Sequence, residues 1–373
     1  MTTSAEAPGS LPGISSPSCA PRGERFPLID AIRGLAAMGI ACYHLDRYGP
    51  IPVAVDPALP EPLEWLLKHS WVGVQFFFVI AGFVAAYSLR GARITPSYVV
   101  NFALRRLIRL GSPYWVVAIL VAGLNVLAIR WLGDDSLAGD VPWSRFFSQL
   151  LFLPDIIGYE NLSAGMWFVA IDLQFGMLLL ILLGIAGWLC RGRPAGSWLD
   201  QLALLALIVP LAMLALFHFN LDSDNEMWAH YFFHLTAFGA VVWWVLEGRL
   251  SASVFWAYLS MMLLGLALYW RWEVAIASIA GVTLYAAARS GAMAWSGGRL
   301  LQYLGRISYS LFLIHYLAQW IVLTLGYRLT GTQPVAGMLW MVLAMVTSLA
   351  AAHALHILVE QPANRLARRL KPH

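Results

Sequence analysis

The 373-residue chain carries little charge, since only 12% of its residues are Asp, Glu, Lys or Arg, about half the share that soluble domains usually have. This scarcity excludes a disordered chain, a nucleic-acid-binding domain and an ordinary cytosolic enzyme. Cysteine is also rare, and Cys19, Cys42 and Cys190 have neither metal-binding spacing nor a credible disulfide framework. A phosphate-binding glycine loop and a G-x-S-x-G nucleophile motif are both missing.

Long apolar runs take the place of charge. Hydrophobic residues make up 60% of the chain, and the mean hydropathy is +0.69. Because a transmembrane helix needs about 20 apolar residues, we expect an all-α polytopic membrane protein with about ten transmembrane helices. The predicted spans are 27–48, 70–89, 113–132, 167–190, 199–219, 229–246, 252–270, 272–288, 306–327 and 335–357.

The two ends of the chain differ from this apolar middle. Residues 1–24 are rich in Ser, Pro, Gly and Ala and show no periodicity, which predicts a disordered cytosolic tail; they contain no apolar core of a signal peptide. Residues 25–358 are predicted to form one transmembrane domain, and residues 359–373 a basic cytosolic C-terminal helix. Residues 96–110 place arginines among apolar positions, which predicts an amphipathic helix at the membrane surface.

Basic residues predict the orientation of the chain in the bilayer. If the predicted spans alternate, most of the 24 Lys and Arg residues fall in segments on one side, and clusters of acids at 134–160 and 222–226 fall on the other. The positive-inside rule then places both termini in the cytosol. The formal net charge of +4 therefore reflects membrane topology, and no nucleic-acid partner is expected.

Ionisable residues inside the predicted spans are candidate functional sites, because a charged side chain in hydrocarbon costs several kcal/mol. Arg33 and His44 lie on one face of the first span, about 16 Å apart along the helix axis. We expect them to line one polar chamber, in which Arg33 holds an anionic donor and His44 activates an acceptor. The alternative is that both side chains extend to the lipid headgroups at the two interfaces.

Five motifs in order carry a family resemblance. They are RFPLIDAIRGLAAMGIACYH at 25–44, GVQFFFVIAGF at 73–83, RRLIRLGSPYW at 105–115, GRISYSLFLIHYL at 305–317 and VEQPANRL at 359–366. Together they resemble the acyltransferase-3 family of integral-membrane O-acyltransferases. The resemblance implies transfer of an acyl group, acetyl in the simplest case, from acyl-CoA to a hydroxyl of a cell-envelope glycan or lipid-linked saccharide. It also implies the bacterial inner membrane, with acyl-CoA as a co-substrate and no permanently bound cofactor.

The same resemblance assigns roles to basic residues. His44 becomes the catalytic base, and Arg33 becomes a catalytic and donor-binding residue. Arg105, Arg106 and Arg109 become candidates for binding the phosphates of acyl-CoA, because a guanidinium pairs with phosphate through two hydrogen bonds. The alternative for these three is ordinary anchoring to anionic lipid.

An intramembrane acid completes the predicted catalytic set. The run WFVAIDLQFG at 167–176 resembles the family's W-S-x-x-x-E-E-Q-F-Y motif and keeps Trp167 and Gln174. Asp172 takes the position of the first Glu, and we expect it to lie at the depth of His44 and to orient the imidazole, as a carboxylate does in hydrolase triads.

Four residues are candidates for contact with substrate: Gln75, Trp167, Gln174 and Glu360. Gln75 stands where many relatives have an acid, so a role that needs a carboxylate cannot be transferred to it. For Glu360, a surface ion pair with a nearby arginine is equally open.

Two other interpretations remain open from the sequence. Ten spans with intramembrane Arg, His and Asp also suit a proton-coupled transporter or flippase of a small molecule or lipid-linked sugar, although the interrupted helices typical of many transporters are not evident. His230 and His234 have a spacing that can bind zinc, but no third ligand is clear, so no metal site is expected. The sequence does not indicate an oligomeric state.

Overall fold

The structure is a computed structural model that describes residues 25–47 and 49–370. Within these residues the secondary structure is helical, with no strand. The predicted tail at 1–24 and the last three residues of the predicted C-terminal helix lie outside the described residues. The α-helices are α1 (Pro27–Arg47), α2 (Pro50–Val55), α3 (Glu61–His69), α4 (Gly73–Ser88), α5 (Pro96–Leu127), α6 (Trp143–Leu150), α7 (Met166–Leu189), α8 (Trp198–Phe217), α9 (Phe233–Leu246), α10 (Ala252–Leu268), α11 (Trp272–Ser290), α12 (Gly298–Thr330), α13 (Pro334–Leu355) and α14 (Gln361–Arg369).

Seven helical stretches of the described chain are long and apolar enough to cross a membrane. They are Pro27–Arg47, Glu61–Ser88, Pro96–Trp131, Met166–Leu189, Trp198–Leu221, Gly298–Thr330 and Pro334–Arg369. The predicted fold class, an all-α polytopic membrane protein, is confirmed. The count of ten spans and the cytosolic location of both termini stay predictions; α9 and α10 are apolar but have only 14 and 17 residues.

Residues 96–110 do not form a separate surface helix, which corrects the sequence-based prediction. They are the first half of α5, which continues through Pro113. The Thr95 side chain caps the helix by accepting a hydrogen bond from the backbone N–H of Tyr98 (3.2 Å), and Pro96 occupies the first turn, where its missing N–H costs nothing. Leu110 is buried just before Pro113. The helix thus continues across the predicted boundary between the surface helix and the span predicted to begin at residue 113. The arginines at 105–109 therefore belong to a long apolar helix.

The last span and the basic C-terminal segment are also continuous. A π-helical turn, His356–Glu360, joins α13 directly to α14. Single π-helical turns are rare and occur frequently at functional sites. The side chains of His356 and Glu360 are both buried in this turn.

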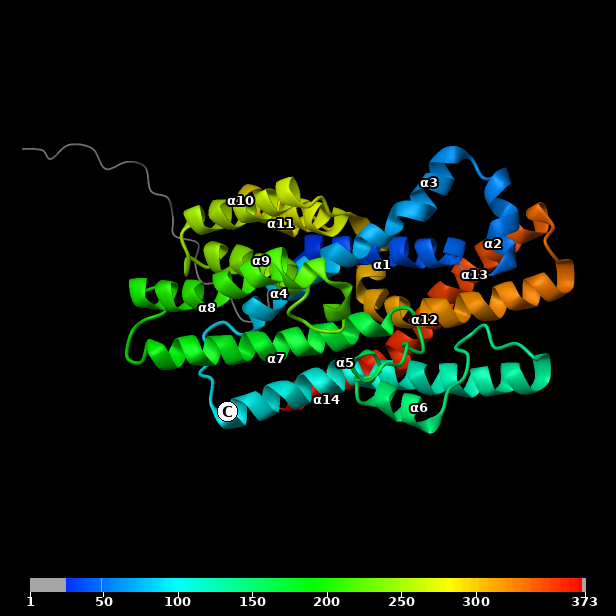
Figure 1. The fold of residues 1–373 in the computed structure, drawn as a ribbon, viewed down its shortest axis with the longest axis horizontal. Coiled ribbons are helices and arrows are strands. Elements are labelled where there is room, and N and C mark those ends of the chain that lie inside the picture. Colours follow the sequence, from blue (N-terminus) through cyan, green and yellow to red (C-terminus); the bar gives the residue numbers. More distant parts are fainter. Residues whose placement is uncertain (1–24, 48, 371–373) are drawn as a thin grey trace, which may run out of the picture.

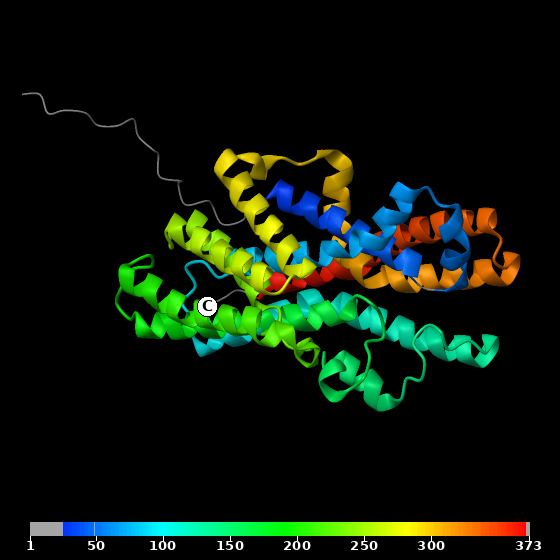
Figure 2. The ribbon, with the colours of Figure 1, turned by 45° about the horizontal axis from the view of Figure 1, so that its top comes forward.

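Two of the family-like motifs meet where α1 lies along α12 (Figures 1 and 2). A Cβ atom on Gly305 would lie 2.1 Å from the Asp30 carbonyl oxygen, and a Cβ atom on Gly34 would lie 2.7 Å from the Gly305 nitrogen. Only glycine permits this backbone approach, because any larger residue would clash with main-chain atoms. The crossing fixes Arg33 and His44 relative to the motif at 305–317.

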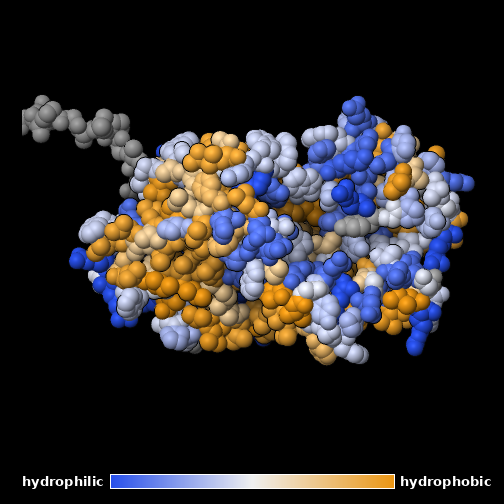
Figure 3. Space-filling model, viewed as in Figure 1, coloured by the Kyte–Doolittle hydropathy of each residue, from blue (hydrophilic) through white to orange (hydrophobic). Residues whose placement is uncertain are grey.

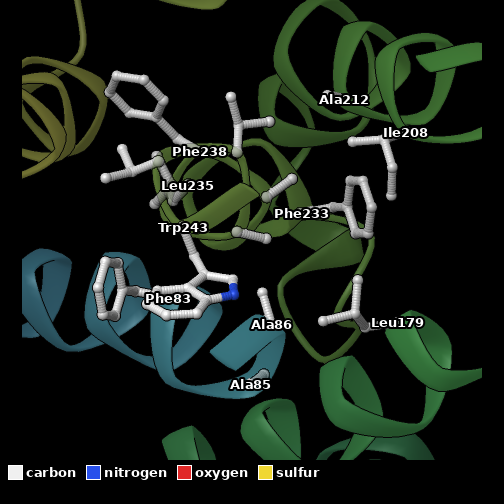
Figure 4. Packing of buried hydrophobic residues seen from close by; sticks show 14 of the residues in the cluster. Phe83, Ala85, Ala86, Leu179, Ile208, Ala212, Phe233, Leu235, Phe238 and Trp243 are labelled. Atoms are coloured by element: carbon white, nitrogen blue, oxygen red, sulfur yellow. The ribbon is translucent and has the colours of Figure 1, made fainter. Parts of the chain in front are cut away.

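The largest buried cluster surrounds α9, whose residues from Phe233 to Trp244 are all buried. Side chains of α4, α7 and α8 converge on it, among them Phe83, Leu179 and Ile208 (Figure 4). The Phe83 ring makes an edge-on contact with Trp243 at a centroid distance of 5.4 Å, a favourable arrangement of aromatic rings. A helix this short and buried on all sides acts as the centre about which the neighbouring helices pack.

Apolar side chains also cover much of the outer surface. Figure 3 shows them gathered over the half of the molecule that holds α7 to α11, whereas hydrophilic side chains gather over α2 and α3. Trp188, Leu202, Trp256 and Leu264 are among the exposed large apolar residues of this half. An apolar surface of this extent is unusual in soluble monomers and suits contact with lipid.

Candidate functional site

Two cavities of opposite charge lie at the two ends of α1. The arginine cavity, of about 490 Å³, lies among α1, α4, α5, α7, α12 and α14. Its charged lining residues are Arg33, Arg105, Arg106, Arg109, Asp172, Glu360 and Arg368. The acidic cavity, of about 1370 Å³, lies among α1, α4, the segment 136–164 and the segment 223–232. Its ionisable lining residues, apart from tyrosines, are His44, Asp140, Arg145, Asp155, Glu160, Glu226 and Glu273.

Arg33 and His44 therefore do not share one polar chamber, which corrects the prediction. Arg33 lines the arginine cavity, His44 lines the acidic cavity, and Phe312 lines both. The Phe312 ring contacts Phe77 and Phe168 at centroid distances of 5.6 and 5.5 Å, and those two rings are 5.9 Å apart. We call these three rings the phenyl partition. Helical periodicity predicts that two side chains face the same way, but it does not reveal what packs between them.

Arg106 is held against α7 by Asp172. Its Nη2 atom lies 2.6 Å from the Asp172 carboxylate and donates to the Asp172 carbonyl oxygen at 2.9 Å. Gly176, one turn further along α7, leaves room for the guanidinium, since a Cβ atom there would lie 2.7 Å from Arg106 Nε. The Asp172 side chain is 13% exposed and that of Arg106 is 10% exposed, so the pair is largely shielded from water.

Asp172 does not adjoin His44, contrary to the predicted orienting role. A rise of 1.5 Å per residue places Asp172 about 7–8 Å along α7 from Trp167. Trp167 lines the acidic cavity, whereas Asp172 lines the arginine cavity with Arg33. The sequence indicates how far Asp172 lies from the start of its helix, but it does not show that Phe168, between Trp167 and Asp172 in the chain, belongs to the phenyl partition.

Three further arginines of this cavity lack an ion-pair partner in the described structure. Among the described residues, no carboxylate forms an ion pair with Arg33, Arg105 or Arg109. Together with Arg106 they project from α1 and from consecutive turns of α5 toward one space. Clustered guanidinium groups of this kind suit an anionic ligand, phosphate above all.

Glu360 lies on the wall of the arginine cavity, but its partners are not arginines. Its Oε2 atom accepts a hydrogen bond from the Ser310 hydroxyl at 2.7 Å and lies 2.9 Å from His356 Nδ1. The predicted surface ion pair with an arginine is thus absent from the described structure. These contacts tie the π-helical turn to α12, so Glu360 contributes to the shape of the cavity wall.

His44 lies beside a second histidine, His315, with ring centroids 5.2 Å apart. His315 is fully buried, and its Nδ1 atom lies 2.9 Å from the Leu311 carbonyl oxygen. A carbonyl only accepts hydrogen bonds, so Nδ1 carries the proton and Nε2 has the lone pair. The imidazole of His44 therefore borders the acidic cavity on one side and a fixed histidine on another.

Gln75 and Ser163 are buried side chains on the wall of the acidic cavity, 5% and 2% exposed. Gln75 Oε1 and Ser163 Oγ have no hydrogen-bond partner in the part of the chain that the structure describes. A buried polar atom is normally paired. Both atoms are therefore suited to hydrogen bonding with a ligand, and contact of Gln75 with substrate stays a prediction.

Gln174, in contrast, bridges two protein segments. Its amide nitrogen donates to the Met227 carbonyl oxygen (3.1 Å), and its oxygen accepts from the Ala229 backbone N–H (2.9 Å). Gln174 lines neither cavity. Its structural setting is that of a tie between α7 and the segment before α9, whereas Trp167 does face the acidic cavity.

Arg145 organises the loop that forms one wall of the acidic cavity. Its guanidinium donates to the carbonyl oxygens of Ala138 (2.6 Å), Asp140 (2.7 Å), Glu160 (3.0 Å) and Asn161 (3.5 Å). With only 8% of its surface exposed, Arg145 is committed to the backbone. Its hydrogen bonds hold the two ends of the loop 136–164 together at the cavity wall.

Asp155 and Tyr231, which line this cavity outside the membrane-spanning helices, have shifted pKa values. Burial raises the pKa of Asp155, while a hydrogen bond from the Asn161 amide (2.7 Å) opposes that rise. Burial, with the nearby charge of Glu226, raises the pKa of Tyr231 to about 12. The Tyr231 phenol therefore keeps its proton at neutral pH and donates a hydrogen bond to the Glu226 carboxylate (3.2 Å).

The described residues contain no group of three His, Cys, Asp or Glu side chains placed to hold a metal ion. His234 is fully buried in α9, and the nitrogen of His230 lies 3.4 Å from the Asn225 side-chain oxygen.

Sequence reasoning missed several residues that shape the site. His315, Arg145, His356 and Gly176 are among them. Arg145 did carry a signal, because it is a basic residue within an acidic segment that the positive-inside rule assigns to the outer side. Gly176 lies one helical turn after Asp172, a spacing that places both on one face.

The region that is similar to known proteins includes most of the residues of both cavities. A family model described as an acyltransferase domain matches residues 26–357, which include most of the lining of both cavities. Nodulation protein 10 of Rhizobium leguminosarum bv. viciae is 26% identical over 355 residues, covering 83% of this chain and 87% of that protein.

Two further relatives match shorter regions. Protein 2 in the picA locus of Rhizobium radiobacter is 29% identical over 143 residues, 35% of this chain and 65% of that protein. Acyltransferase MdmB of Streptomyces mycarofaciens is 25% identical over 145 residues, 39% of this chain and 35% of that protein. No solved structure matches the chain.

Proposed function

Since the chain belongs to the acyltransferase-3 family, and is therefore a multi-pass membrane O-acyltransferase, we propose the identity of its donor and acceptor. The donor is acyl-CoA, with acetyl-CoA the simplest case, and it enters the arginine cavity from the cytosol. The acceptor is a hydroxyl of a cell-envelope glycan or lipid-linked saccharide, which enters the acidic cavity from the outer side of the bacterial inner membrane.

The arginine cavity supports the choice of donor. Acyl-CoA is a polyanion at its nucleotide end and carries its thioester at the far end of a flexible arm. Arg33, Arg105 and Arg109 offer guanidinium groups without carboxylate partners in the described structure, and Arg106 lies among them. The cavity volume of about 490 Å³ falls within the range of ligand pockets, roughly 300–1,000 Å³, and suits part of the nucleotide with the start of the arm.

His44 supplies the chemistry on the other side. A sugar hydroxyl is a poor nucleophile until a base removes its proton, and a histidine suits that task near neutral pH. The imidazole of His44 accepts the hydroxyl proton as the hydroxyl oxygen attacks the thioester carbonyl carbon. The carbon–sulfur bond then breaks, CoA leaves as a thiolate, and His44 returns the proton to that sulfur. The products are the O-acyl acceptor and CoA, and His44 is neutral again.

One observation carries this proposal: two cavities of opposite charge meet at Phe312, with Arg33 on one and His44 on the other. An anionic donor and a hydroxyl acceptor that bind at separate sites can react only where the sites meet. The thioester arm therefore passes the phenyl partition to reach the space beside His44. In this proposal the reaction takes place within the bilayer, between two entrances.

His44→Ala tests the proposal. Purified protein in nanodiscs is supplied with acetyl-CoA and an extract of envelope glycan, and released CoA thiol and acylated glycan are measured. We expect His44→Ala to lower transfer by about 10²–10⁴-fold, the usual contribution of a general base, with CoA affinity and thermal stability unchanged. His353→Ala is the matched control, because that exposed histidine lines neither cavity.

Two results would contradict the proposal. Transfer by His44→Ala at more than a tenth of the wild-type rate would remove the assigned base. Failure of the wild-type protein to bind CoA at all would instead favour the proton-coupled transporter or flippase.

A further inference from the structure

Negatively charged side chains outnumber positively charged ones in the lining of the acidic cavity, and this excess limits the ligands that the cavity can bind. Five carboxylates line it, against one guanidinium. That guanidinium belongs to Arg145, which is buried and donates to backbone carbonyl oxygens. Arg271, two residues before Glu273 in the chain, does not line the cavity and donates to the carbonyl oxygens of Leu216 and Asn220. Of the cationic side chains in the described structure, Arg145 alone, His44 aside, therefore faces this space, and four of its five N–H groups donate to backbone carbonyl oxygens.

The carboxylates of the wall are hydrogen-bond acceptors, whereas its tyrosine hydroxyls and tryptophan N–H groups can donate. Gln75 Oε1 is buried on the wall without a partner among the described residues, and the carboxylates can only accept while ionised. Ser163 Oγ, also buried and unpartnered there, can either donate or accept. A ligand that satisfies such a wall must donate hydrogen bonds, as hydroxyl and ammonium groups do and as carboxylate and phosphate groups do not.

Aromatic side chains complete the lining. Trp71, Trp167 and Tyr316 face the same space. Ligand sites commonly combine flat apolar faces with a few polar groups that fix orientation, and the apolar face of a sugar ring fits against an aromatic ring. A volume of about 1370 Å³ exceeds what a single small molecule needs and suits several linked sugar units.

We propose that the acidic cavity takes an uncharged or positively charged oligosaccharide and disfavours acceptors that carry carboxylate or phosphate groups inside the cavity. This inference rests on the proposed function, since it names the class of acceptor for that reaction. Like charges at close range repel, so the same carboxylates that admit a hydroxyl-rich or amino sugar reject an anionic one. Because the two cavities have opposite charge, the polyanionic donor is attracted to the arginine cavity and repelled from the acidic cavity. The two substrates therefore bind at different sites.

Binding of three size-matched probes tests the proposal without requiring turnover. The probes are tetrasaccharides of glucosamine, N-acetylglucosamine and galacturonic acid, which are cationic, uncharged and anionic at neutral pH. Their dissociation constants are measured by calorimetry on the full-length protein in nanodiscs. We expect the galacturonate probe to bind at least about tenfold more weakly than the other two, because several carboxylates of the cavity repel the carboxylates of the probe. Added salt reduces the difference in dissociation constant between the galacturonate probe and the other two, because salt screens the repulsion between charges.

A charge-neutralising variant locates the effect. In the Glu160→Gln, Glu226→Gln double variant, we expect the galacturonate probe to bind at least about threefold more tightly, since two sources of repulsion are removed. Asp135→Asn is the matched control, because Asp135 is an exposed acid of the same outer segment that does not line the cavity. It removes one charge from the surface without changing the wall.

The outcomes separate this inference from the proposed function. Equal or tighter binding of the galacturonate probe by the wild-type protein, or an equal gain in affinity from Asp135→Asn, would overturn the charge selectivity. Failure of all three probes to bind at millimolar concentration would also overturn it. CoA binding, measured on the same sample, reports the arginine cavity independently: its loss counts against the proposed function, and its retention in the variants shows that the protein is folded.

Discussion

Gly176→Ala tests whether the placement of Arg106 governs donor binding. The new methyl group would lie 2.7 Å from Arg106 Nε and 2.8 Å from Cζ, closer than carbon and nitrogen atoms approach in folded proteins. The atoms that must give way belong to the far end of a flexible side chain. The guanidinium therefore moves off α7 at little cost to folding, and its contact with Asp172, 2.6 Å in the wild-type protein, is disturbed.

The expected loss of donor affinity follows from the strength of one contact. A hydrogen bond to a charged group contributes about 1.5–3 kcal/mol, and 1.4 kcal/mol corresponds to a tenfold change in affinity. If the displaced Arg106 no longer reaches a phosphate of the donor, CoA binds roughly 10- to 150-fold more weakly. Helix propensity works in the other direction, because replacing an interior helical Gly by Ala stabilises a helix by up to about 1 kcal/mol.

Calorimetric titration of CoA into the purified protein measures the effect, with thermal unfolding as the check on folding. Gly187→Ala is the matched control, since Gly187 lies on the same helix and a Cβ atom there would meet nothing within 4 Å. We expect the control to bind CoA as the wild-type protein does. If Gly176→Ala folded normally and bound CoA within twofold of the wild type, the proposed role of Arg106 in holding the donor would be wrong.

Three further substitutions probe other parts of the structure. Arg33→Lys should lower the transfer rate at least about tenfold while the protein stays folded, because an ammonium lacks the planar, two-pronged geometry of guanidinium. Gly305→Ala should lower the thermal unfolding temperature, with a loss of about 1–3 kcal/mol or more, since its methyl group would lie 2.1 Å from the Asp30 carbonyl oxygen; an unchanged melting curve would contradict the close helix crossing. Gln174→Leu should cost about 1–3 kcal/mol of stability by leaving the Ala229 N–H and Met227 carbonyl unpaired, and a selective loss of transfer without destabilisation would instead restore Gln174 as a substrate-contacting residue.

The all-α, membrane-spanning character of this protein could be predicted from its sequence, because apolar runs and helical spacing are local properties. Arg33 and His44 lie on α1 as predicted. The continuity of α5 could not be predicted in the same way. A proline and a cluster of arginines both indicate a break near residue 113, and the burial of Leu110 against distant segments decides otherwise.

The arrangement of the site depends on contacts between distant parts of the chain. Asp172 pairs with Arg106, 66 residues earlier, and the phenyl partition combines Phe77, Phe168 and Phe312 from three helices. No local pattern reveals such contacts. Four of the five carboxylates of the acidic cavity lie in the acidic clusters of the sequence, where they indicated only the side of the membrane. The loop 136–164, which folds around Arg145, brings three of them, Asp140, Asp155 and Glu160, to the cavity wall.

A cryo-electron microscopy structure of the wild-type protein with an unreactive acetyl-CoA analogue tests the central claim most directly. The account predicts density for the phosphates against Arg33, Arg106 or Arg109 in the arginine cavity, with the arm extending past Phe312 toward His44. Density for the nucleotide in the acidic cavity, or an arm that runs away from the phenyl partition into lipid, would contradict it.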